Sequence, residues 1–327
     1  MNPGNIPSYG GSYSHYGNYG NQSASSSAPV APQPSTVHGS MPETSLRLRG
    51  QYSNAVTQVK PQTLQNLQLA DQIQKETQRY LPHGAGNQWL SVVHSQGESY
   101  ARGHLAREYK KEFRKQAPQL DRTYNSARTA ATLQGGNCQE FADVAYTLLA
   151  ARGAKSPVSN VSYKNDHILV MLGDPRESSR DIALVDAWPH VPVATTLRNS
   201  HINPNDLVVK KQFNSQLGDP NAQWALSNIQ PMSNTEVNQR MMAQGFPAIG
   251  PALVKDLAEG LQEQGLQLYD VRSLSADPSL KYTDGYHQPT SFDAMSSSQL
   301  AGKMSVVREY NQKVSSNPGL YGRFKDV

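Results

Sequence analysis

Three residues of the sequence have the types and the order of a thiol-based catalytic site. Cys138 is the only cysteine of the chain, and His167 and Asp186 follow it in that order. In sites of this kind the thiolate is the nucleophile, the imidazole transfers the proton and the carboxylate orients the imidazole. The three residues therefore predict a Cys-His-Asp triad that attacks an acyl or amide carbon.

A helix over residues 138–152 is expected to position Cys138. Gly136 and Asn137 come just before this segment and Gly153 follows it, as start and stop signals of a helix do. The apolar positions recur at helical spacing, namely Phe141, Val144, Ala145, Leu148 and Leu149. A cysteine in the first turn meets the partial positive charge of the helix N-terminus, which favours the thiolate. Free N–H groups at the same place can hold an oxyanion.

Two short apolar runs are expected to carry the other two residues on strands. The runs are HILVML at 167–172 and IALVDAW at 182–188, each bounded by turn residues. If the strands pair as an antiparallel hairpin, the end of the second lies beside the start of the first. This arrangement would place Asp186 next to His167.

Three neighbouring residues are candidates for binding the oxyanion or the substrate. We expect the oxyanion hole to combine the Cys138 N–H with a side-chain amide, either of Asn137 or of Gln134. Asn137 is an equally good candidate for the N-cap of the helix. Trp188 is expected to pack beside the site, with a substrate contact as the alternative.

Other assignments stay open at this point. His190, His201 and Asp206 are alternatives for the base and the orienting carboxylate if the strand boundaries are shifted. A lone cysteine is also common as a small buried hydrophobic residue. His167 and Asp186 have the corresponding structural alternatives of a buried histidine and a turn residue.

The composition excludes several other kinds of site. A chain of 327 residues with one cysteine forms no internal disulfide and no multi-cysteine zinc site, and this usage is typical of a reducing compartment. No metal and no organic cofactor is implied. No apolar stretch reaches the length of about 18 residues that a membrane span needs, and the N-terminus lacks the pattern of a secretory signal peptide.

Residues 1–45 form a low-complexity leader that we expect to be disordered. The segment is rich in Gly, Ser, Asn, Pro and Tyr, and it buries too little apolar surface to offset the entropy of ordering. Three interpretations are open: a flexible tail, an uncleaved secretion signal, or a self-associating tail built on its repeated tyrosines.

Residues 46–327 are expected to form one domain with helices on both sides of a small sheet. Helices are predicted at 61–82, 235–265 and 297–315, and at 88–116 as one helix or as two broken near Gly103. The segment 88–116 is basic, with Arg102, His104, Arg107, Lys110, Lys111, Arg114 and Lys115. We interpret this run mainly as a solvated face and secondarily as a stripe for a partner or a phosphate. Few aromatic residues are interleaved, so nucleic acid is not an expected partner.

The segments GGNCQEFADVAYTLL, DHILVM and ALVDAWP together resemble the transglutaminase-like branch of the papain superfamily. In that family a glycine-flanked cysteine begins a helix, a histidine follows on a strand, and an aspartate followed by a tryptophan ends the next strand. The resemblance covers roughly residues 130–192. It implies an α+β papain/transglutaminase-like fold, with the nucleophile helix packed on a small antiparallel sheet and additional helices. Asn137 and Gln139 flank the cysteine where family transglutaminases often have Gln and Trp, which argues against protein cross-linking.

The triad and the polar leader are also similar to those of bacterial type III effectors of the AvrPphE/HopX kind. This similarity implies a cysteine protease, Gln deamidase or transglutaminase that acts on a host protein substrate through an acyl-thioenzyme. It further implies secretion by a bacterium without a cleaved signal peptide, a possible secretion chaperone and action in the host cell cytoplasm. The alternatives are a protein that stays in the cytoplasm, and a non-enzymatic module that binds host proteins and retains the fold.

Overall fold

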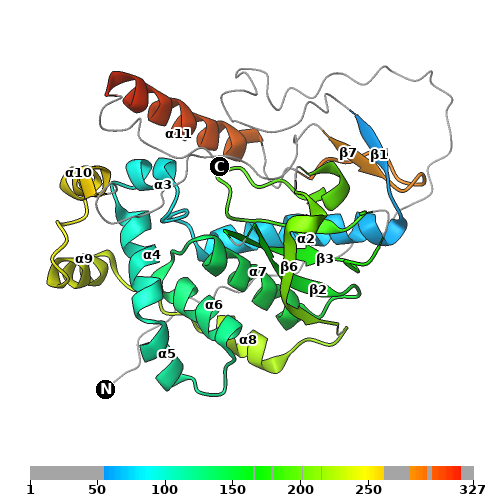
Figure 1. Cartoon of the computed structure of the whole chain (residues 1–327), viewed down its shortest axis with the longest axis horizontal. Coiled ribbons are helices and arrows are strands. Elements are labelled where there is room, and N and C mark those ends of the chain that lie inside the picture. Colours follow the sequence, from blue (N-terminus) through cyan, green and yellow to red (C-terminus); the bar gives the residue numbers. More distant parts are fainter. Residues whose placement is uncertain are drawn as a thin grey trace, which may run out of the picture. The chain divides into compact units, whose positions relative to one another are not determined.

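Helix α7 (Cys138–Arg152) is the central element of the part of the chain that the computed structural model describes (Figure 1). That part comprises residues 55–164, 166–177, 180–200, 202–214, 216–260, 280–292 and 297–317. The helix has the bounds that the sequence predicts. It packs against strands of the main sheet and against three helices, α2 (Pro61–Tyr80), α6 (Arg122–Leu133) and α8 (Pro220–Leu226).

The main sheet has five antiparallel strands in the order β5-β4-β3-β2-β6. Their bounds are β2 Val158–Tyr163, β3 His167–Leu172, β4 Ala183–Val185, β5 Thr195–Thr196 and β6 Leu207–Phe213. The sequence predicts β3 with these bounds. It predicts β4 too long, because the paired strand ends at Val185 and Asp186 lies just beyond it.

Both faces of β3 are covered, which explains why its sequence is an uninterrupted apolar run. Val170 and Leu172 belong to the core that α2, α6 and α7 share with the sheet. Leu169 and Met171 alternate with them and pack in a separate cluster with Leu197. A strand buried on both faces gains more apolar contact than one that faces water, so β3 is a rigid support for the residue that begins it.

A second hydrophobic core is formed mainly by helices other than α2, α6, α7 and α8. Its members come from α3 (Trp89–His94), α4 (Glu98–Glu108), α9 (Asn234–Ala243), α10 (Pro251–Gly260) and α11 (Ser297–Ser316). The predicted helix at 88–116 is three helices, since α5 (Lys110–Gln116) follows α4 directly. The predicted break near Gly103 is wrong, because Gly103 lies inside α4 and the chain turns at Gly97, where φ is +92°.

The segment 235–265, which the sequence predicts to be helical, is not one continuous helix. The chain forms two helices there, α9 and α10, which are separated by a segment that contains Gly245 and Gly250. A small parallel pair of strands, β1 (Val56–Gln58) and β7 (Lys281–Thr283), lies outside the main sheet. The leader at 1–45, residues 261–265 and His201 lie outside the described residues.

The architecture is therefore α+β, with a small antiparallel sheet and many helices, as the sequence predicts at this level. None of the helices in the described ranges is long and apolar enough to cross a membrane.

Candidate active site

Cys138 is the first residue of α7 and is partly exposed. Its Sγ donates a weak hydrogen bond to the main-chain oxygen of Asp166, at 3.7 Å. Asn137 is the N-cap residue, and its N–H donates to Oε2 of Glu140 at 2.8 Å, which is one half of a capping box. The thiol thus lies where the helix N-terminus offers partial positive charge and free N–H groups.

The two glycines before Asn137 are required by the close approach of other atoms. A Cβ on Gly135 would lie 2.5 Å from Cβ of Arg102, and a Cβ on Gly136 would lie 2.2 Å from Cβ of Glu140. Any larger residue would displace either α4 or the first turn of α7. The Gly-Gly pair therefore fixes the position at which α7 begins.

His167 begins β3 and forms a buried pair with Asp186. Its Nε2 lies 2.8 Å from Oδ2 of Asp186, and the two residues are 6% and 4% exposed. In the antiparallel pairing of β3 with β4, Val185 lies opposite Val170, so the chain that continues from β4 to Asp186 runs towards the start of β3. The carboxylate is held in turn, because its Oδ1 accepts a hydrogen bond from the N–H of Trp188 at 3.3 Å.

The environment of His167 favours the imidazolium. Burial alone would lower the pKa of His167, but the charge of Asp186 and the hydrogen bonds to Asp186 and Cys138 raise it to about 10. Cys138 is among the groups that raise this pKa, so its thiol lies near the imidazole, whose Nε2 is bound to the carboxylate of Asp186. A cation next to a cysteine favours the thiolate, which is the nucleophilic form.

Trp188 packs beside His167, with the two ring centroids 5.0 Å apart. Its Nε1 donates to Oδ1 of Asn87 at 2.9 Å, and its main-chain oxygen accepts from Nε2 of Gln88 at 2.8 Å. The loop with Asn87 and Gln88 lies next to the start of α7, because the N–H of Gly86 donates to the oxygen of Gly136 at 2.9 Å. The loop, the tryptophan and the nucleophile helix thus form one connected wall of the site.

The other residues that the sequence suggests for the site have different surroundings in the structure. Gln134 is the C-cap of α6 in a left-handed conformation, with φ at 54°, and its side chain hydrogen-bonds to His83. His190 does not replace His167, because its Nε2 lies 3.3 Å from the main-chain oxygen of Lys303. Asp206 lies in a short 3-10 helix before β6.

The structure also shows two features in and near the site that the sequence does not predict. Asn87 and Gln88 hold Trp188 from a loop far away in the chain, and only their position after Gly-Ala-Gly marks them as a structured turn. The sequence predicts a mainly solvated face for the basic run, but Arg102 is 1% exposed and its guanidinium donates hydrogen bonds to Glu98, Leu133, Met232 and Asn234.

Among the described residues, no three His, Cys, Asp or Glu side chains gather as a metal site. Comparisons with protein-family models, with curated proteins and with solved structures find no match to this chain.

Proposed function

We propose that the chain is a cysteine enzyme of the papain/transglutaminase-like kind that cleaves or exchanges amide bonds of proteins. The observation that carries the proposal is the buried pair of His167 and Asp186, which are 2.8 Å apart, near Cys138 at the first turn of α7. A nucleophile, a proton carrier and an orienting carboxylate in this arrangement perform acyl transfer through a thioester.

Each residue has a definite task in the proposed reaction. The Cys138 thiolate attacks the amide carbon, and the oxyanion that forms is held by N–H groups at the start of α7. His167 then donates its proton to the leaving amine, the C–N bond breaks and a thioester remains on Cys138. In the second step His167 removes a proton from water or from an amine, which attacks the thioester and releases the thiol.

The nature of the amide and of the second nucleophile decides the reaction. Water acting on a peptide bond gives proteolysis, and water acting on a Gln side chain gives deamidation. An amine acting on the Gln-derived thioester gives transglutamination. In keeping with the resemblance to type III effectors of plant-pathogenic bacteria, we propose a protein of the host cell as the substrate, and delivery of the enzyme by a bacterium.

Mass spectrometry of a plant cell extract tests this proposal. The extract is incubated with the wild-type chain and, in parallel, with Cys138→Ala and Cys138→Ser, which preserve the size of the side chain closely. New peptide termini with the wild type alone would indicate proteolysis, Gln-to-Glu conversion would indicate deamidation, and cross-linked peptides would indicate transglutamination. If the wild type and both variants give the same peptides, the enzyme proposal is wrong and a binding role is favoured.

A further inference from the structure

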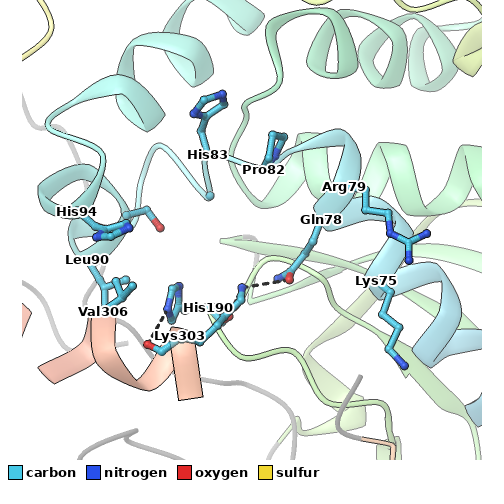
Figure 2. Close-up of a pocket in the computed structure, with 13 residues that line it drawn as sticks. Lys75, Gln78, Arg79, Pro82, His83, Leu90, His94, His190, Lys303 and Val306 are labelled. Carbon is cyan, nitrogen blue, oxygen red and sulfur yellow. Dashed lines mark hydrogen bonds between the residues drawn. The ribbon is translucent and has the colours of Figure 1, made fainter. Parts of the chain in front are cut away.

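A cavity of about 720 Å³ lies between α2, the segment with α3, and α11. Its volume is in the range of sites for small molecules. In Figure 2, Lys75, Gln78 and Arg79 come from α2, His94 from α3, and Lys303 from α11. None of the triad residues lines this cavity, so it is separate from the site of the thiol chemistry.

The lining of this cavity is cationic. Lys75, Arg79 and Lys303 are among its lining residues, which include no aspartate or glutamate. Histidines also line it, but burial lowers the pKa of His83 and, together with the nearby Lys303, lowers that of His190 to about 3. The positive charge at neutral pH therefore comes from Lys75, Arg79 and Lys303, and burial lowers the pKa of Lys303 to about 8.

Lys303 has an unusual set of partners for a half-buried ammonium group. Its Nζ donates to Oε1 of Gln78 at 3.1 Å and to the main-chain oxygen of His190 at 2.7 Å. Both acceptors are uncharged, and no carboxylate of the described residues pairs with this lysine. An ammonium group has three N–H donors, so one donor remains for a ligand. A buried cation without a counter-charge is costly, and a bound anion would supply that charge.

The two cations of α2 lie at the exposed side of the cavity. Lys75 pairs with Asp71 at 2.9 Å on the helix surface, whereas Arg79 has no ion-pair partner within the described part of the chain. An arginine offers a planar pair of donors that matches phosphate oxygens. Three cations around one cavity suit a ligand that concentrates several negative charges in a small volume.

A second hollow of about 440 Å³ links this cavity to the catalytic wall. It shares Gln78, Arg79, His190 and Lys303 with the first cavity and extends to Gln88 and Trp188. Trp188 packs against His167, so a ligand held by Lys303 would lie on the wall that supports the triad.

We propose that this cavity binds a small soluble ligand that carries two or more phosphate groups, through Lys75, Arg79 and Lys303. The ligand is either an inorganic polyphosphate or a nucleotide, which share the same phosphate chemistry. The site is independent of the proposed thiol reaction, because binding needs no turnover.

Calorimetry with the full chain tests the site, with tripolyphosphate and ATP as separate probes. The test variant is Lys75→Gln/Arg79→Gln, which removes two exposed cations of α2 and leaves the core untouched. The matched control is Lys111→Gln/Arg114→Gln, which removes one lysine and one arginine from α5, where they line another basic pocket. We expect the wild type and the control to bind at least one probe equally, and the test variant to bind it about tenfold more weakly or not at all.

The two probes distinguish the source of the phosphate groups, since tighter binding of ATP would show that the nucleoside contributes. Equal weakening in both double variants would indicate non-specific attraction and overturn the proposal. Loss of binding in the control alone would assign the ligand to the α5 pocket and overturn it as well. The same conclusion follows if neither probe binds the wild type at millimolar concentration.

Discussion

At the scale of single residues, two buried ionisable groups next to the start of α7 have opposite effects on stability. His167 gains a carboxylate partner and stays charged, whereas the side chain of Asp143 is buried and accepts hydrogen bonds from side-chain amides. Nε2 of Gln139 donates to Oδ1 of Asp143 at 2.8 Å, and Asn160 contacts the same oxygen at 3.4 Å. Burial raises the pKa of Asp143 from 3.8 to about 7.

This pKa makes the stability of the chain depend on pH. The unfolded carboxyl loses its proton near pH 3.8 and the folded one near pH 7, so the folded state is penalised increasingly as the pH rises between these values. We predict that Asp143→Asn, whose amide oxygen can accept the same hydrogen bonds, gains stability relative to the wild type between pH 5 and pH 8. The gain should be on the order of 2 kcal/mol in urea denaturation.

The exposed Asp256→Asn substitution on α10 is the control for this measurement and should show no such trend with pH. A stability difference between Asp143→Asn and the wild type that stays constant from pH 5 to pH 8 would show that the carboxyl is not perturbed as described.

At the scale of elements, the Gly-Gly pair decides where α7 begins relative to α4. We predict that Gly135→Ala lowers the free energy of unfolding by about 1 to 3 kcal/mol, because the added Cβ would overlap Arg102. The measurement is denaturant unfolding together with the reactivity of the thiol. The matched control is Gly302→Ala in α11, where an added Cβ meets no atom within 4 Å and alanine favours the helix. Equal effects of the two substitutions would contradict the role given to Gly135.

Elements with a strong local pattern were predictable from the sequence. The helix at 138–152 has glycines at both ends and a regular apolar stripe, and β3 is an uninterrupted apolar run. The helix α6 was missed because its buried positions include Asn125, Ser126 and Thr129, which give no apolar periodicity. The edge strand β6 was missed because most of its side chains face water, including Val208 and Val209.

The same reasoning explains which parts of the candidate site were predictable. The proximity of His167 and Asp186 follows from the local geometry of a hairpin, and the position of Cys138 follows from helix signals. The contacts of Trp188 with Asn87 and Gln88 depend on a loop that comes close only through the tertiary fold. No spacing in the sequence connects these residues, so they could not be found in advance.

For the molecule as a whole, Arg102 is a link between helices, because its hydrogen bonds connect segments that are far apart in the sequence. Its guanidinium binds Oε1 of Glu98 at 2.8 Å, the main-chain oxygens of Leu133 and Met232 at 2.8 and 3.2 Å, and Oδ1 of Asn234 at 2.5 Å. These partners belong to α4, to the end of α6, to the segment before α9 and to the start of α9. Since α6 leads directly into the segment before Cys138, this cluster also supports the nucleophile.

We predict that Arg102→Met destabilises the chain by about 3 to 5 kcal/mol, because Glu98 and the two main-chain oxygens lose their buried donor. Thermal or urea denaturation measures the effect. The exposed Arg107→Met on the same helix should change stability by no more than about 0.5 kcal/mol. If the two substitutions cost the same, Arg102 does not have the structural role inferred from its contacts.

We propose that His167 activates the thiol of Cys138. The direct test is to measure the rate at which iodoacetamide alkylates Cys138 as a function of pH. The reagent reacts with the thiolate, and the chain has no other cysteine, so the signal has one source. We predict that the folded wild type reacts at pH 6 at least about tenfold faster than His167→Gln, whose thiol lacks the imidazolium neighbour. Equal rates at pH 6 for the wild type, the variant and the urea-unfolded chain would contradict it.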